Sequence, residues 1–303
     1  GRAGRVHVKS VVVIGNFDGV HNGHVEVLRH AQSLAPGQPL VVVTFWPHPM
    51  SVLRPERAPR LLITLGERIR LLKASGAAEV RVVQFTRDVS TWSPEEFVQR
   101  VIAPLDPSHV VVGENFRFGY RAQGTVQTMT EIGAGHFEVD AMPLVAVEGD
   151  RTCSTLIREC LESGDVEQAS RHLGRWFRLR GVVVMGDQRG REMGFPTANL
   201  PIGAGWCVPA DGVYAGWLTC VDEPDAKPLP AAISVGTNPT FNGLERRVET
   251  YVLDRTDLQL YGSKIAVDFV ARLRGQVTFT GMDSLIEQMH ADVVRTREIL
   301  KIN

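Results

Sequence analysis

Four short aliphatic runs in the first half of the chain constrain its fold more strongly than any other feature. They are largely continuous rather than alternating, which is typical of parallel strands buried on both faces of a sheet. Helix-like segments separate them, with predicted starts at Thr64 and Ser93, each followed three residues later by a glutamate. This succession predicts a doubly wound α/β domain with a parallel sheet, in which ligands bind at the carboxyl ends of the strands. The runs are Val11–Ile14, Leu40–Val43, Val80–Val83 and Val110–Val112.

The second half of the chain has a different pattern. From Arg178 onward, short β-branched or alternating stretches are separated by turn residues, which predicts an antiparallel barrel or sandwich. Helical periodicity returns at about 284–299, and Asp283 is the predicted N-cap of this closing helix.

The boundary between these two patterns is predicted near residues 164–176. Asp165 and Gln168 suit the start of a short helix that ends at Gly174. We therefore expect two domains, residues 1–174 and 175–303, which agrees with the length of 303 residues.

Composition excludes several classes of protein. There are 33 Lys and Arg against 34 Asp and Glu, a net charge of -1, so a basic field for nucleic acid or an acidic membrane surface is absent. No apolar run approaches the roughly 20 residues that span a bilayer, and no secretory signal is recognised at the start of the sequence. The four cysteines lack the spacing of a zinc or redox site. We expect a cytoplasmic protein with reduced thiols and small-molecule partners, and the sequence leaves open whether it forms a homo-oligomer.

The loop after the first predicted strand carries the most specific motif, GNFDGVHNGH, from Gly15 to His24. Its glycines, including Gly23, allow a tight turn, and the following helix offers its amide end to a phosphate. His21 and His24 stand at that helix start, where both rings can face one anion. Two alternatives are a polar turn with solvated histidines and a zinc pair, although no further Cys or His cluster supplies the remaining ligands. The combination of strand, H-x-G-H and helix favours nucleotide chemistry.

Two further segments of the first half are candidates for ligand binding. One places the hydroxyls of Ser154 and Thr155 at an apparent helix start, with Arg158 one turn later and Arg151 just before, and could hold a polyphosphate. The alternative is an ordinary helix cap with surface arginines. The other segment is 113–119, after the fourth run, whose two aromatic residues either pack on a planar ring or anchor a loop to the core.

In the second half, a Gly- and Arg-containing loop precedes the sequence Pro-Thr-Ala-Asn at 196–199. Glycines suit a loop that closes over phosphates. Thr197 and Asn199 are two residues apart, so on an extended segment their oxygens lie on the same side, where they suit magnesium with bound phosphates. The alternative is a turn in which the Asn side chain bonds its own backbone. The loop residues singled out for nucleotide binding are Gly186, Arg189 and Gly194.

These motifs resemble those of known enzymes. The H-x-G-H at 21–24, with the hydroxyls and arginine at 154–158, resembles the nucleotidylyltransferase superfamily. The sequences at 17–21 and 113–119 look like the FMN adenylyltransferase module of prokaryotic bifunctional riboflavin kinase/FAD synthetases. The Pro-Thr-Ala-Asn sequence resembles the riboflavin kinase motif, as do GTNPTF at 236–241, ETYVLD at 249–254 and Tyr-Gly at 261–262. The resemblance covers essentially the whole chain.

The resemblance implies two successive reactions. In the C-terminal barrel, riboflavin is phosphorylated by MgATP to FMN, with Glu249 as the base and magnesium at Thr197 and Asn199. A salt bridge to Arg246 or Arg247 is the alternative role for Glu249. In the N-terminal domain, FMN attacks the α-phosphate of ATP, giving FAD and pyrophosphate. The residues implied there are His21, His24, Arg151, Ser154, Thr155 and Arg158 for the phosphates, Gly15, Asn16, Phe17, Asp18 and Gly23 for the nucleotide loop, and Asn115 and Phe118 for the flavin.

Two other functions remain open on the sequence alone. One is a non-catalytic flavin-binding or sensing protein on the same scaffold. The other is a kinase whose nucleotidylyltransferase half uses another substrate, such as a pantetheine phosphate or CTP. The paired histidines and the acid, hydroxyl and amide side chains favour catalysis, because a pure binding protein has no use for groups that stabilise pyrophosphate.

Overall fold

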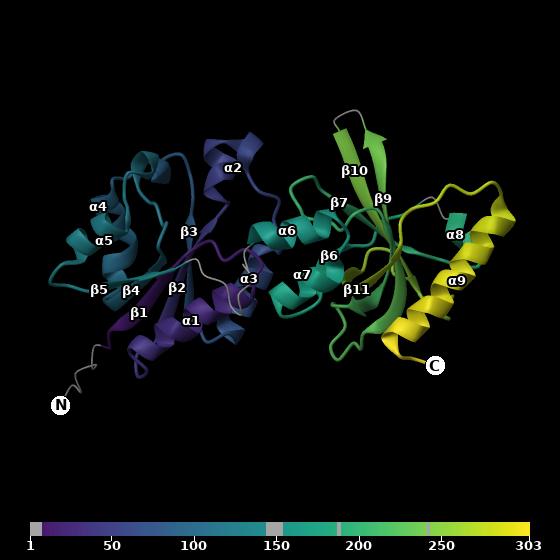
Figure 1. Ribbon diagram of the computed structural model, residues 1–303, viewed down its shortest axis with the longest axis horizontal. Coiled ribbons are helices and arrows are strands. Elements are labelled where there is room, and N and C mark those ends of the chain that lie inside the picture. The colour runs from purple at the N-terminus through teal and green to yellow at the C-terminus, as the bar shows by residue number, and fades with distance from the viewer. Residues whose placement is uncertain (1–7, 144–153, 187–188, 241–242) are drawn as a thin grey trace. The chain divides into compact units, whose positions relative to one another are not determined.

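The computed structural model describes residues 8–143, 154–186, 189–240 and 243–303, which form two compact units (Figure 1). The first unit comprises Gly1–Pro59 and Thr64–Thr152, and the second comprises Arg60–Ile63 and Cys153–Asn303. In the described part of the chain, no helix is both long enough and apolar enough to cross a membrane.

The first unit contains a five-stranded sheet in which every pair of neighbours is parallel. The predicted aliphatic runs form four of its strands, and the three central strands are the most deeply buried. The fifth strand has no apolar run and lies at an edge, where its residues are partly exposed. The doubly wound prediction is confirmed. The strands are β1 (Ser10–Ile14), β2 (Leu40–Trp46), β3 (Glu79–Gln84), β4 (Pro107–Gly113) and β5 (Glu138–Met142).

Helices pack on this sheet through side chains that alternate along its strands. One apolar cluster joins β1, β2 and β4 to α4, to α5 and to the helical turn Val98–Ile102 that follows α4. Helix α1 packs beside β1. Ser93 and Thr64 cap α4 and α3 as predicted, each accepting a hydrogen bond from the amide three residues later. The helices are α1 (Asn22–Leu34), α2 (Pro49–Leu53), α3 (Leu65–Ala74), α4 (Pro94–Phe97) and α5 (Val126–Gly133). Short turns of other helix types lie at Pro55–Arg57, Val89–Thr91, Val98–Ile102, Ala103–Leu105 and Tyr120–Ala122.

The strand order β3-β2-β1-β4-β5 determines where a ligand can bind. From β1 the chain builds the sheet first toward β2 and β3, and then returns to the other side of β1 with β4. In sheets of this type the loops after the two strands at this reversal leave a crevice between them. The loops that follow β1 and β4 are therefore the candidates for a binding site.

The second unit contains a six-stranded antiparallel sheet in the order β6-β11-β8-β9-β10-β7. A β-bridge joins Val184, two residues after the edge strand β6, to Asn199 of the other edge strand β7, so the sheet is close to a closed barrel. The predicted antiparallel β-barrel is confirmed. The strands are β6 (Phe177–Val182), β7 (Ala198–Ile202), β8 (Gly212–Cys220), β9 (Leu229–Thr240), β10 (Gly243–Val252) and β11 (Lys264–Arg274).

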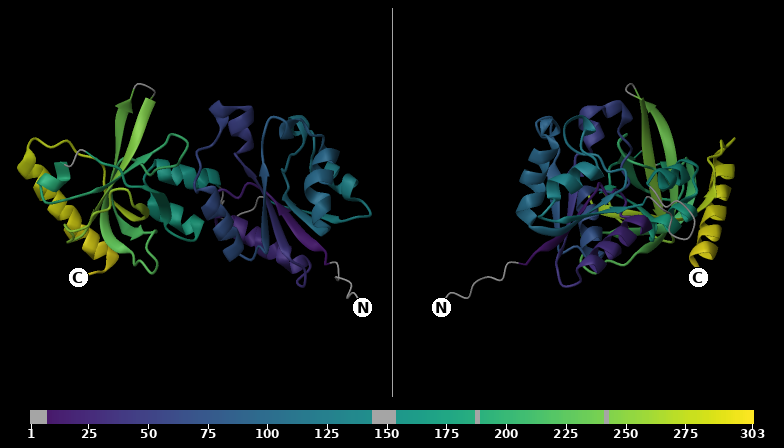
Figure 2. Two further views of the ribbon diagram at one scale, coloured as in Figure 1. Left: turned by 180° about the vertical axis from the view of Figure 1, so that it is seen from behind. Right: turned by 60° about the vertical axis from the view of Figure 1, so that its left-hand side comes forward.

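Four helices accompany this sheet in the described residues: α6 (Ser154–Glu162), α7 (Val166–Leu173), α8 (Arg189–Glu192) and α9 (Met282–Leu300). The closing helix α9 runs alongside the sheet (Figures 1 and 2). It begins at Met282 with Gly281 as N-cap, so the prediction that Asp283 caps it is wrong. Asp283 lies inside the first turn, where its carboxylate stabilises the positive end of the helix dipole.

A short segment from early in the sequence completes the second unit. The backbone of Leu61 donates to Gly205 at 2.8 Å and accepts from Cys207 at 2.9 Å. The Nε atom of Arg158 on α6 donates to the carbonyl of Arg60 at 2.8 Å. The contacts of α6, α7 and Arg60–Ile63 therefore place these segments in the second unit, with the barrel. A catalytic-domain boundary at residues 174 and 175 stays a prediction.

We expect a fragment of residues 154–303 to be more stable than one of residues 174–303. The shorter fragment lacks α6 and α7, which contribute the buried side chains of Leu161, Val166 and Leu173. The backbone carbonyl of Leu161 also accepts a hydrogen bond from the Ala210 amide. Because a buried aliphatic side chain contributes about 1.5–3 kcal/mol, and ordering the helices offsets part of that, the expected loss is on the order of 3 kcal/mol. Urea denaturation followed by circular dichroism measures it. Equal free energies of unfolding would show that the helices contribute nothing to the barrel.

Candidate active sites

The loop between β1 and α1 has an unusual backbone. Phe17, Gly19 and Val20 all have positive φ angles, of 54°, 93° and 42°. Such angles cost free energy for residues other than glycine and are concentrated at binding and catalytic sites. The ring of Phe17 packs on the backbone of Gly15, where an added Cβ would lie 3.0 Å from the ring. A side chain at Gly15 would therefore require the Phe17 ring to shift by a few tenths of an ångström.

His21 and His24 lie together at the start of α1. His21 is the N-cap and is 5% exposed; its Nδ1 accepts from the His24 amide at 3.3 Å. In return, Nδ1 of His24 accepts from the His21 amide at 3.2 Å. The two rings stack with centroids 3.5 Å apart, and Gly23 between them lies in the first turn of the helix. Because each Nδ1 is an acceptor, a neutral ring carries its proton on Nε2, which is a hydrogen-bond donor suited to a phosphate oxygen.

Asp18 and the side-chain oxygen of Asn16 are buried in the same loop. Asp18 is 4% exposed. The carbonyl of Asn16 accepts a hydrogen bond from the Thr44 hydroxyl at 2.8 Å, and its side-chain Oδ1 is buried without a hydrogen-bond partner in the described structure. A buried amide oxygen of this kind costs free energy unless a ligand supplies a donor. Among the described residues there is no group of three or more His, Cys, Asp or Glu side chains that could hold a metal ion, so the zinc alternative has no further ligands there.

The loop after β4 contains the residues that the sequence assigns to the flavin. Asn115 is exposed. Phe118 is 6% exposed, stacks on Phe116 with centroids 5.4 Å apart and also contacts Phe97. These contacts favour the alternative in which Phe118 anchors the loop to the core, and they leave Phe116 as the less buried of the two rings. A role for Asn115 and Phe118 in flavin binding stays a prediction.

The third predicted element of this site starts α6. Ser154 and Thr155 are the first two residues of the helix. The Arg158 guanidinium donates to the carbonyl of Arg60, within the second unit. Arg151 lies outside the described residues. The participation of these four residues in phosphate binding stays a prediction.

In the second unit, strand register brings the predicted metal ligand and base together. Asn199 on β7 pairs with Glu249 on β10, and residues directly opposite in an antiparallel pair have side chains on the same face. Asn199 is 4% exposed, and its Oδ1 has no hydrogen-bond partner in the described structure. Arg246 pairs with Asp211, and Arg247 lies 4.0 Å from Glu245.

Three glycines before β7 have restricted positions or backbone angles. A Cβ on Gly186 would lie 3.0 Å from the Asn199 amide nitrogen, and one on Gly190 would lie 2.4 Å from the carbonyl oxygen of Phe195. Gly194 has a φ of 84°, which a side chain would strain. Arg189 is the first residue of α8.

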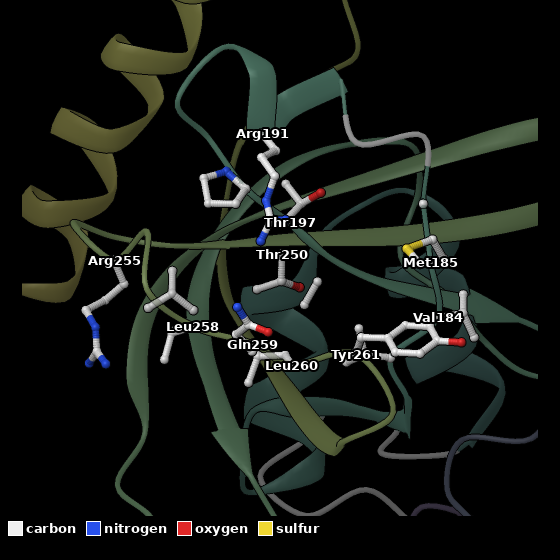
Figure 3. Close-up of a pocket in the computed structure, with 15 residues that line it drawn as sticks. Val184, Met185, Arg191, Thr197, Thr250, Arg255, Leu258, Gln259, Leu260 and Tyr261 are labelled. Carbon is white, nitrogen blue, oxygen red and sulfur yellow. The ribbon is translucent and has the colours of Figure 1, made fainter.

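Two cavities have Thr197 in their lining. The larger, of about 520 Å³, is lined by Gly186, Arg191, Thr250 and Tyr261 as well as Thr197 (Figure 3). The smaller, of about 290 Å³, has apolar and aromatic walls from α9 and the segment before it. Glu249 lines the smaller cavity and Thr250 the larger, because successive residues of β10 point to opposite faces. Thr197 therefore borders both cavities, one on each face of the sheet at this point.

Several lining residues were not predicted from the sequence. Arg274 of β11 forms a two-bond ion pair with Asp292 of α9, at 3.0 and 2.8 Å, which ties the helix to the sheet beside the smaller cavity. The ring of Phe279 lies 5.9 Å from the Arg274 guanidinium. No local motif marks these residues. Thr250, in contrast, could have been found from the two-residue alternation of β10.

Comparison with known proteins matches one family model to each half of the chain. Residues 4–156 match the family model described as "FAD synthetase", and residues 173–300 match the one described as "Riboflavin kinase". A protein of Bacillus subtilis (strain 168), described as "Bifunctional riboflavin kinase/FMN adenylyltransferase", is 34% identical over 292 residues, which are 94% of this chain and 90% of that protein. The chain belongs to this family.

Another bifunctional riboflavin kinase/FMN adenylyltransferase, that of Escherichia coli (strain K12), is 33% identical over 292 residues, covering 95% of this chain and 92% of its own length. A crystal structure described as "Macrolide-efflux Protein from Streptococcus pneumoniae" has a TM-score of 0.84 and 34% identity, and covers 96% of this chain and 94% of that one. The family resemblance seen in the motifs is confirmed.

Proposed function

We propose that the chain carries out the two reactions of its family at separate sites, one around Thr197 of the second unit and the other at the histidine loop of the first. The chain phosphorylates riboflavin to FMN and then transfers an adenylyl group from ATP to FMN, which gives FAD. The observation that carries this assignment is the pairing of Asn199 with Glu249 between β7 and β10, beside two cavities that both have Thr197 in their lining.

For the kinase reaction, ATP occupies the larger cavity, next to the glycine-containing loop, and riboflavin occupies the smaller cavity, which has apolar and aromatic side chains on α9 and the segment before it. The terminal ribityl hydroxyl attacks the γ-phosphorus, the bond from that phosphorus to the bridging oxygen breaks, and ADP leaves. An alcohol is a weak nucleophile, so Glu249 accepts its proton. The position of Glu249 in the smaller cavity supports this role.

Magnesium is the metal that suits the oxygens near Thr197. The Thr197 hydroxyl and the Asn199 amide oxygen are hard ligands, and the amide oxygen is buried without a hydrogen-bond partner in the described structure, as expected of a group that awaits a ligand. When bound with ATP, the metal neutralises the charge that develops on the transferred phosphate. Gly186, Arg189 and Gly194 belong to the loop over the nucleotide.

For the adenylyl transfer, the FMN phosphate attacks the α-phosphorus of a second ATP and pyrophosphate leaves. The phosphate is already anionic, so no base is needed, and catalysis consists of positioning and charge stabilisation. His21 and His24 donate to the phosphates at the N-terminus of α1. The loop of Gly15, Asn16, Phe17, Asp18 and Gly23 holds the nucleotide, Arg151, Ser154, Thr155 and Arg158 bind phosphate oxygens, and Asn115 and Phe118 contact the flavin.

We expect Asn199→Ala to lower riboflavin phosphorylation by roughly 10- to 100-fold and to increase the magnesium concentration needed for half-maximal rate, because one ligand of the metal is lost. FMN adenylylation on the same sample is the control and stays unchanged. Thermal stability is not expected to fall, because the side-chain oxygen makes no hydrogen bond in the described structure. An unchanged magnesium requirement would remove Asn199 from the metal site.

A chelator is expected to stop the kinase reaction while leaving the circular dichroism spectrum unchanged, because the metal arrives with the nucleotide.

We also propose that the chain works in the cytoplasm on small-molecule substrates. The thiols of Cys160 and Cys220 suit a reducing compartment.

A further inference from the structure

A buried arginine lies beneath the nucleotide loop of the first unit. Arg68, on α3, is 1% exposed and heads the largest fully buried side chains of the described chain. Arginine is almost never fully buried unless its charge is paired. No motif in the sequence marks this burial. The neighbouring Glu67 forms an i,i+3 ion pair with Arg70 on the same helix.

The guanidinium of Arg68 bonds to the end of β2 rather than to a carboxylate. Its Nη1 donates to the Thr44 hydroxyl at 3.1 Å and to the Phe45 carbonyl at 3.0 Å. The ring of Trp46 lies 5.5 Å from the guanidinium carbon. The Nε atom is buried and has no hydrogen-bond partner among the described residues. The hydrogen-bonding capacity of the side chain is therefore used only in part, so its burial costs free energy that an apolar residue would not cost.

The bonds of Arg68 continue to the nucleotide loop. The Thr44 hydroxyl accepts from Arg68 and donates its own proton to the carbonyl of Asn16, at 2.8 Å, on the residue that follows Gly15. This connection joins α3, β2 and the loop after β1 just before the residues with positive φ begin. These hydrogen bonds therefore hold the backbone at Asn16, next to the strained residues of the loop.

The charge of Arg68 also acts on this loop. Burial lowers the pKa of the Arg68 guanidinium from its ordinary value, and the charge of Asp18 raises it. Asp18 is itself buried and lies three residues before His21. An arginine stays protonated at neutral pH, so a fixed positive charge is present in the interior behind the loop.

We propose that Arg68 is a positioning residue for the adenylyl transfer. It holds the nucleotide loop through Thr44 and the backbone of Asn16, so that His21 and His24 meet the polyphosphate in a fixed geometry. The proposal rests on the assignment of this loop to the nucleotide. A positioning role predicts a loss of kcat with little change in KM for FMN, because a displacement of reacting groups by about 1 Å can cost on the order of 10² in rate.

Three substitutions test the proposal. Arg68→Met keeps the length of the side chain and removes its donors, and Arg68→Lys keeps the charge. Thr44→Val removes only the hydroxyl that links Arg68 to Asn16. Arg70→Met, on the same helix but with its side chain 59% exposed, is the matched control. For each variant we would measure kcat and KM for FMN adenylylation, riboflavin phosphorylation on the same sample, and thermal unfolding.

The expected result is a fall in adenylylation kcat of roughly 10- to 100-fold for Arg68→Met and Thr44→Val. The double variant is expected to fall little further, since both changes break one connection. Arg68→Lys is expected to recover part of the rate, while Arg70→Met and the kinase reaction of every variant stay at parental levels.

A kcat within twofold of the parental value in Thr44→Val would overturn the proposal, even if Arg68→Met failed to fold. Equal losses in Arg68→Lys and Arg68→Met, or additive losses in the double variant, would also overturn it. These outcomes differ from a failure of the proposed function, which would appear as full adenylylation activity in His24→Ala.

Discussion

His24→Ala is expected to reduce FAD formation from FMN by about 10²–10³-fold, as the removal of a donor to a developing anionic charge does in other enzymes. The substitution removes one of two stacked imidazoles and also the capping bond to the His21 amide. FMN formation from riboflavin should be unchanged, because the residues proposed for it lie in the other unit. Chromatography of flavins over time, with ATP and either riboflavin or FMN, measures both rates.

His30→Ala is the matched control, since His30 lies on the same helix but pairs with Asp140 at 3.1 Å rather than with the loop. It should retain FAD formation. Added zinc should restore nothing to His24→Ala. Stoichiometric zinc in the purified parental protein, or recovery of the variant with zinc, would mean that the histidine pair binds a metal instead of phosphate.

Glu249→Gln is expected to lower riboflavin phosphorylation by about 10²–10⁴-fold, the contribution of a general base, with FMN adenylylation intact. Glutamine keeps the size and hydrogen bonding of the side chain, so the pairing of Glu249 with Asn199 between β10 and β7 should survive. The rate is measured with riboflavin and MgATP at saturating concentrations, and unfolding by heat shows whether the barrel is intact.

Glu245→Gln is the control on the same strand, because Glu245 lies near Arg247 at the surface. It should phosphorylate riboflavin normally. A Glu249→Gln protein with the parental kinase rate would leave Glu249 with a structural role, and another group would have to accept the proton.

The central strands and the histidine loop could be predicted because their signals are local. Val11–Ile14 and Leu40–Val43 are continuous apolar runs because both faces of their strands are buried. A helix start can be recognised from the few residues around its N-cap. The strand Glu138–Met142 gave no such signal, because it is partly exposed and carries polar residues. The other edge strand was found from the run Val80–Val83, although it is largely exposed rather than buried on both faces. Arg60–Ile63 could not be assigned to the second unit, since it pairs with residues far along the chain.

The candidate sites were predictable only in part, because a motif is local in the sequence but a cavity depends on contacts between distant residues. Thr197, Asn199 and Glu249 follow from motifs, but the cavities on either side of Thr197 depend on how β10 and α9 pack. Phe118 illustrates the limit: an aromatic residue in a loop suits either a ligand or the core, and only the packing of Phe97 and Phe116 favours the core. The burial of Arg68 likewise depends on β2, which precedes its helix.

We expect this one chain to hold two separate active sites that act in sequence. The most direct test is a flavin chromatogram of His24→Ala, Glu249→Gln and an equal mixture of both, each with riboflavin and MgATP. We predict that the first accumulates FMN, that the second leaves riboflavin unchanged but converts added FMN to FAD, and that the mixture converts riboflavin to FAD. Loss of both activities in either variant, or a parental protein that binds flavin without forming FMN or FAD, would contradict this account.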